Sequence, residues 1–124
     1  IASIHARTAM TMQAGWKTIS EAFPERFLLG LGVSHQPMVE GVHGTAYDKP
    51  YSTMVAYLDA MDRGMFFAAP PAGRPQRVLA ALGPKMLRLS AWGAELPFVP
   101  TWVSGSQRVV PVAGSYVPRK IRPL

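Results

Sequence analysis

The sequence has no cysteine, few acidic residues and no long hydrophobic run. The absence of cysteine excludes disulfides, thiolate metal sites and a cysteine nucleophile. No apolar stretch approaches the roughly 20 residues needed to cross a bilayer, and residues 1–14 lack the pattern of a secretory signal peptide. At 124 residues the chain can form one domain, but it is too short for a complete α/β barrel of about 250 residues. We expect a cytoplasmic chain with no membrane partner, and its start at Ile1 suggests a piece of a longer protein.

Acidic residues are outnumbered by basic ones, seven to thirteen, which gives a net charge of +6. The last 34 residues carry half of this excess, with four basic residues against Glu95. A basic tail can bind phosphate backbones. Here the basic residues are sparse and do not alternate with aromatic ones, so we expect no nucleic-acid partner. A basic nucleic-acid-binding piece remains an alternative that rests on charge alone.

The first half of the chain alternates between helical and strand patterns. A helix is predicted over 8–23, where apolar residues recur every three or four positions and Pro24 ends the run (Met12, Trp16, Ile19 and Phe23). The apolar run 27–32 is typical of a strand buried on both faces. The polar, glycine-rich stretch 33–50 is long enough to be a functional loop. A second helix is predicted over 52–62, with Met54, Leu58 and Met61 on its buried side.

The alternation continues to about residue 94. A proline-rich connector over 66–76 leads into a second buried strand at 77–81, and Pro84 favours a helix over 85–91. Strands that alternate with helices predict an α/β fold with a parallel sheet. After residue 94 prolines recur and the pattern stops, so we divide the chain into a domain over 1–94 and an irregular basic tail over 95–124. In the tail, Val109, Val110 and Val112 could form an edge strand, interrupted by Pro111.

Two segments carry candidate site residues. The first is Gly30 to His35, which places Ser34 and His35 just beyond a strand, where α/β proteins bind ligands. The alternative interpretation is a turn glycine and a loop histidine with its hydrogen bonds satisfied. The second is Ala80 to Lys85, in which Gly83 precedes a helix N-terminus that can bind an anion such as phosphate. The alternative there is an ordinary tight turn.

The three histidines give no support for a metal site. His5 follows a short apolar stub, and its spacing to His35 and His43 is irregular. No pair of acids is placed to complete a catalytic triad with Ser34. We therefore expect no metal.

Together, three stretches resemble the luciferase-like monooxygenase superfamily, most closely its deazaflavin-dependent branch, which uses coenzyme F-420. They are Ile1–Arg7, Glu21–His35 with its Gly-Leu-Gly-Val-Ser-His string, and Arg77–Leu87 with Leu-Ala-Ala-Leu-Gly-Pro. The segments Pro50–Met54 and Ala56–Met61 also fit that branch. The resemblance covers residues 1 to about 94.

The resemblance implies part of a (β/α)8 TIM barrel, about strands three to five, with the cofactor at the carboxyl ends of the strands. In that family the cofactor is coenzyme F-420, with FMN as the alternative, and it transfers a hydride to or from a small-molecule substrate. The implied cofactor-binding residues are Ser3, Val33, Ser34, His35, Ala81, Leu82, Gly83 and Pro84, the last three at the phosphate. His35 is the implied catalytic residue, and the full-length parent is expected to form a homo-oligomer.

The chain also departs from the family. The first two strands are missing before Ile1, Ser3 stands where the family has asparagine, and the family's continuation is missing after Ala94. One hypothesis is that the tail is read in a shifted frame, because 112–119 could encode a family string in another frame. The alternative to an oxidoreductase fragment is a non-catalytic truncated remnant of that enzyme.

Overall fold

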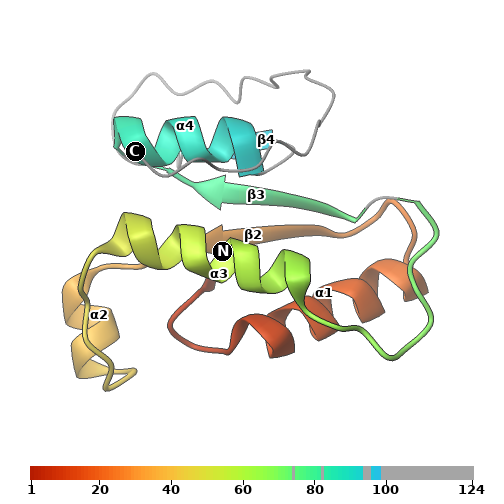
Figure 1. Ribbon diagram of the computed structural model, residues 1–124, viewed down its shortest axis with the longest axis horizontal. Coiled ribbons are helices and arrows are strands. Elements are labelled where there is room, and N and C mark those ends of the chain that lie inside the picture. Colours follow the sequence, from red (N-terminus) through yellow and green to blue (C-terminus); the bar gives the residue numbers. More distant parts are fainter. Residues whose placement is uncertain (74, 82, 94–95, 99–124) are drawn as a thin grey trace.

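The structure is a computed structural model that describes residues 1–73, 75–81, 83–93 and 96–98. Its elements are β1 (Ala2–Ser3), α1 (Ala9–Ala22), β2 (Leu28–Gly32), α2 (Gln36–Gly41), α3 (Pro50–Arg63), β3 (Gln76–Ala80), α4 (Pro84–Gly93) and β4 (Leu96–Phe98). Helices and strands alternate as the sequence predicted, which confirms the α/β class (Figure 1). The predicted edge strand at 109–112 and the frame-shift hypothesis concern residues outside those described.

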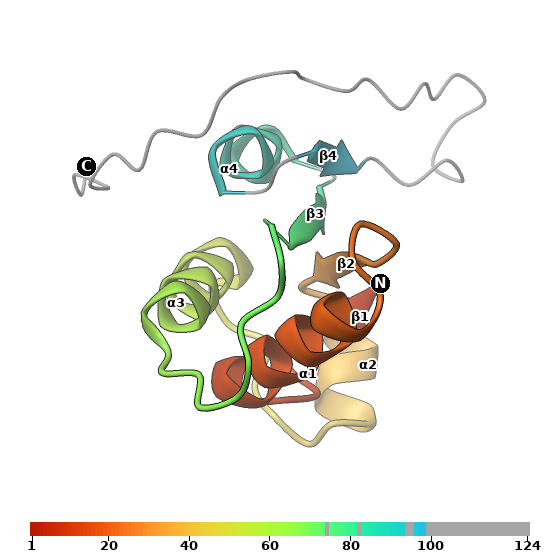
Figure 2. The same cartoon turned by 90° about the vertical axis from the view of Figure 1, so that its right-hand side faces the viewer.

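The strands form one parallel sheet whose order follows the chain, β1-β2-β3-β4. Right-handed crossovers between sequential parallel strands place all connecting helices on the same face, and Figure 2 shows α1, α3 and α4 on one side of the sheet. A doubly wound sheet would reverse its strand order and carry helices on both faces. The described residues are therefore a singly wound α/β unit, compatible with part of a (β/α)8 barrel.

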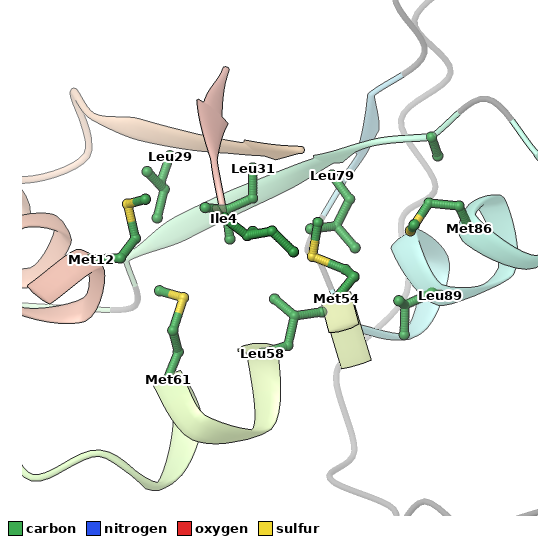
Figure 3. Close-up of a cluster of buried hydrophobic side chains, with 11 residues drawn as sticks. Ile4, Met12, Leu29, Leu31, Met54, Leu58, Met61, Leu79, Met86 and Leu89 are labelled. Atoms are coloured by element: carbon green, nitrogen blue, oxygen red, sulfur yellow. The ribbon is translucent and has the colours of Figure 1, made fainter. Parts of the chain in front are cut away.

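The hydrophobic core lies between this sheet and the helices (Figure 3). Leu29, Leu31 and Leu79 point from the strands toward the helical layer. The predicted buried side of α3 is confirmed, since its three apolar residues are at most 5% exposed (Met54, Leu58 and Met61). Met12, Met86 and Leu89 complete the cluster from α1 and α4.

The sequence predicted that β2 is buried on both faces, but one of its faces is only partly covered. Leu28 is 46% exposed and Gly30 is half-buried, because the helices cover one face only. On the other face the Ile1 side chain lies against the strand, and a Cβ on Gly30 would come within 2.6 Å of Ile1 Cδ1. The glycine therefore permits this close approach.

Helix α1 has the predicted extent, with Thr8 as its N-cap. Of its predicted apolar face, Met12 is buried in the core and Trp16 packs against it, but the other two residues are exposed. Ile19 and Phe23 are 41% and 56% exposed, whereas Gln13 and Ser20 are buried. The physical reason lies at the end of α3, where the Gln13 side-chain amide donates to the carbonyls of Met61 and Gly64, the latter at 2.9 Å. These hydrogen bonds turn the Gln13 side of α1 inward.

Two elements were not predicted. Helix α2 lies within the stretch expected to be a loop; its first turn contains Pro37, a common helix-start residue. Strand β4 pairs with β3 beyond residue 94, where the alternation was expected to stop. Pro97 is compatible with β4 because proline is tolerated in edge strands. Among the described residues, no helix is both long and apolar enough to cross a membrane.

Candidate functional site

The carboxyl ends of β1, β2 and β3 lie next to one another at one edge of the sheet. Ser3 pairs with Gly32 in parallel register, and Leu31 pairs with Leu79. Neighbouring strands in a sheet are about 4.8 Å apart. The turns after these strands, which contain most of the predicted site residues, are therefore brought together at a single edge. Leu82 is the one predicted site residue outside the described part of the chain.

Ser34 has a strained backbone in the turn after β2. Its φ is +59°, in the left-handed region that residues other than glycine rarely adopt. The Tyr47 hydroxyl donates to the Ser34 carbonyl oxygen at 3.2 Å, which holds this conformation from the far end of the 33–50 loop. Val33, just before it, is half-buried and packs against the core. Ser34 is likewise half-buried, so both predicted residues lie in this turn with part of their surface accessible.

His35 is the N-cap residue of α2 and is exposed. Its carbonyl accepts from the N–H groups of Met38 and Val39, both at 3.1 Å, so its backbone begins the helix. Its side chain makes no capping hydrogen bond. The imidazole therefore stands at the sheet edge, accessible from solvent.

Ser3 has a structural partner. Its Oγ accepts from the His5 backbone N–H at 3.3 Å and shapes the turn after β1. A serine hydroxyl has one proton and two lone pairs, so Ser3 can still donate to a ligand while it accepts this hydrogen bond.

The turn after β3 leads directly into α4. Ala81 is fully buried in the core, so its side chain faces away from any surface ligand. Gly83 and Pro84 are exposed, and apart from the chain neighbours of Gly83 no described residue has an atom within 4 Å of a Cβ built on it. The Gly83 carbonyl accepts from Leu87 N–H at 2.9 Å, so α4 begins at this turn. The first N–H groups of a helix have no acceptor inside the helix. This end of α4 has the donors and the space to hold an anion.

His5 and Tyr47 are residues at this edge that sequence reasoning did not assign to the site. Their ring centroids are 5.8 Å apart, so Tyr47 bridges the turns after β1 and β2. Burial, and then the charge of His43, lower the pKa of His5 from its usual 6.5. The short apolar segment before His5 indicated that this residue follows a strand, but no sequence pattern predicts its contact with Tyr47.

Among the residues that the structure describes, no three His, Cys, Asp or Glu side chains form a group that could hold a metal ion. The sequence matches no protein-family model, no curated protein and no solved structure.

Proposed function

We propose that this chain is part of a luciferase-like oxidoreductase that binds coenzyme F-420, or FMN, and transfers a hydride between that cofactor and a small-molecule substrate. The observation that carries the proposal is the convergence of Ser3, Ser34, His35 and Gly83 at the carboxyl edge of a singly wound parallel sheet. Ligands of α/β barrels bind at that edge. The proposal places the described residues in a (β/α)8 barrel.

The residues at this edge fit such a cofactor. Among the described residues, space is left at Gly83, and the N–H groups at the start of α4 would donate to the cofactor's phosphate there. Ser3 and Ser34 would donate to polar atoms of its ring system. The cofactor supplies the hydride chemistry when bound, and the protein orients the ring and excludes water. His35 would hold or donate a proton at its imidazole toward the substrate.

Fluorescence titration of coenzyme F-420 with the chain tests the proposal. We expect weak but saturable quenching, because one sheet and its helices supply part of the pocket wall. Salt-dependent retention on DNA without quenching would instead favour the nucleic-acid alternative. The absence of both signals would favour the non-catalytic remnant.

Gly83→Val tests the phosphate turn in the longer enzyme. The added side chain would occupy the space expected for phosphate, so binding of the intact cofactor should weaken by about 2 kcal/mol or more. Calorimetric titration with the intact cofactor and with its dephosphorylated fragment measures the difference. The control is Gly15→Val, since no described residue outside the helix backbone lies within 4 Å of a Cβ built on Gly15 in α1. An equal effect of Gly83→Val on both compounds, or no effect, would exclude this turn as the phosphate site.

A further inference from the structure

A second candidate binding site lies between the β1–α1 turn and α3. A cleft of about 470 Å³ is lined there by residues that include His5, Arg7, Thr8, Thr45 and Tyr57. The cleft is shallow and open to solvent over most of its extent, so it suits a small group rather than a ligand buried by about 70–90%, as in enclosed small-molecule sites. None of these residues is assigned a role in cofactor binding or hydride transfer by the proposed function, although His5 lies near the same sheet edge.

The charge of this cleft favours an anion. Arg7 is exposed, and no ion pair with a carboxylate is formed by it among the described residues. The lining contributed by the described residues contains no acidic side chain. A cleft lined by one sign of charge attracts ligands of the opposite sign.

Backbone and hydroxyl donors add to this charge. Helix α1 begins at the cleft, and its N-cap, Thr8, accepts from Thr11 N–H at 3.2 Å. The N–H groups of Ala9 and Met10, in the first turn, have no acceptor within the helix. The Tyr57 hydroxyl, on α3, donates to the Arg7 carbonyl at 2.9 Å. This hydrogen bond attaches the loop that contains Arg7 to α3.

An independent observation comes from His5. Its Nε2 is buried and makes no hydrogen bond with any described residue. Buried polar atoms nearly always have a partner. Because burial lowers the pKa of His5, the ring is neutral near pH 7, and one of its nitrogens can donate to an anion.

We propose that this cleft binds the oxyanion group, phosphate or carboxylate, of a small molecule, held by the Arg7 guanidinium, the first N–H groups of α1 and the His5 imidazole. The site is separate from the α4 turn. Anion binding there requires no deazaflavin, so the test of this site does not depend on the function proposed above.

NMR titration of the chain tests this site, with inorganic phosphate and acetate in separate arms at constant ionic strength. We expect saturable shifts of the Ala9 and Met10 amides and of the His5 ring in at least one arm; the arm that saturates at lower concentration identifies the preferred group. Arg7→Gln should weaken that binding about tenfold. Arg63→Gln is the matched control, because Arg63 is an exposed arginine on α3 paired with Asp59 at 2.9 Å, and it should bind as the wild type does.

The amide spectrum of each variant shows whether it is folded, so a loss of binding can be separated from a loss of structure. Tyr57→Phe provides a second variant, expected to weaken binding less than Arg7→Gln because it removes the anchor of the loop and leaves the guanidinium. Linear shifts in both arms, or equal binding by Arg7→Gln and Arg63→Gln, would overturn the proposal.

Discussion

The guanidinium of Arg77 on β3 forms a two-pronged ion pair with the carboxylate of Asp62 on α3. Nη1 lies 2.7 Å from Oδ1 and Nη2 lies 2.9 Å from Oδ2. The Arg77 side chain is 9% exposed and that of Asp62 is 48% exposed. Arg77 also lies over the Trp16 ring of α1, at 5.5 Å from its centroid. One buried cation therefore connects β3, α3 and α1 near the amino ends of the strands, away from the candidate site.

Removing the carboxylate should cost more than removing the cation. Asp62→Ala leaves a mostly buried guanidinium without this carboxylate, and we expect a loss of about 1–2 kcal/mol after allowance for the exposed side of the pair. Arg77→Met keeps apolar contact with Trp16 and leaves a carboxylate that water can reach, so its cost should be smaller. Urea unfolding measures both. Asp59→Ala, at an exposed pair, is the control and should change stability by less than about 0.5 kcal/mol; the opposite ranking of the first two variants would contradict this interpretation.

Gln13 should be important for the stability of the α1–α3 contact. It is 1% exposed and its amide donates to two backbone carbonyls near the end of α3. Gln13→Met would leave those carbonyls without this donor, and we expect a loss of about 2 kcal/mol in urea unfolding. Gln36→Met is the control, because Gln36 donates to Glu40 at an exposed position. A similar loss of unfolding free energy in the two variants would show that the buried hydrogen bonds contribute little to stability.

Tyr47 should hold the Ser34 turn. Tyr47→Phe removes the hydroxyl that donates to the Ser34 carbonyl, a loss of about 1 kcal/mol that corresponds to roughly fivefold faster local opening. Amide hydrogen exchange of Met38 and Val39, which donate to the His35 carbonyl next to Ser34, measures this change. Tyr51→Phe, at an exposed position on α3, should leave those exchange rates as they are. Unchanged exchange in Tyr47→Phe would mean that the strained φ of Ser34 is maintained by other contacts.

His5 should make stability depend on pH. Its pKa is lowered in the folded state, first by burial and then by the charge of His43. The unfolded chain therefore binds the proton at a higher pH than the folded chain does. The stability that comes from neutral His5 is present above about pH 6.5 and is lost as the pH falls through the folded pKa.

Urea midpoints between pH 7.5 and 5 measure this dependence. His5→Gln should flatten the profile relative to the wild type. The control, His35→Gln, alters an exposed residue and should keep the wild-type slope. A His5→Gln profile as steep as that of the wild type would exclude His5 as the source.

His35 should affect turnover more than cofactor binding if the proposed function holds. In the longer enzyme, His35→Ala should lower kcat about tenfold or more and leave cofactor affinity within about twofold, because a side chain that faces the reacting atoms acts mainly in the transition state. Steady-state kinetics and calorimetry measure the two quantities. An unchanged kcat would remove His35 from the site.

The sequence alone was enough to locate most of the elements. Short-range signals predicted α1, α3, β2 and β3 to within a few residues: the apolar spacing of each helix, Pro24 after the first helix, and the apolar runs of the strands. The same signals predicted that Ser34, His35 and Gly83 follow strands, and parallel pairing then placed their turns at one edge. Such features depend on the local backbone and on neighbours within a few positions, so they can be inferred from the order of residues.

Only the tertiary structure decided which side of α1 faces inward and which residues meet across the site. Helical periodicity shows which residues share a face, but it does not show that Gln13 finds carbonyls near Gly64 while Phe23 stays exposed. Nor does it bring Tyr47 to Ser34 and His5, or Arg77 to Asp62. Each of these contacts joins separate elements, and its free energy depends on burial and geometry that exist only once the helices have packed against the sheet.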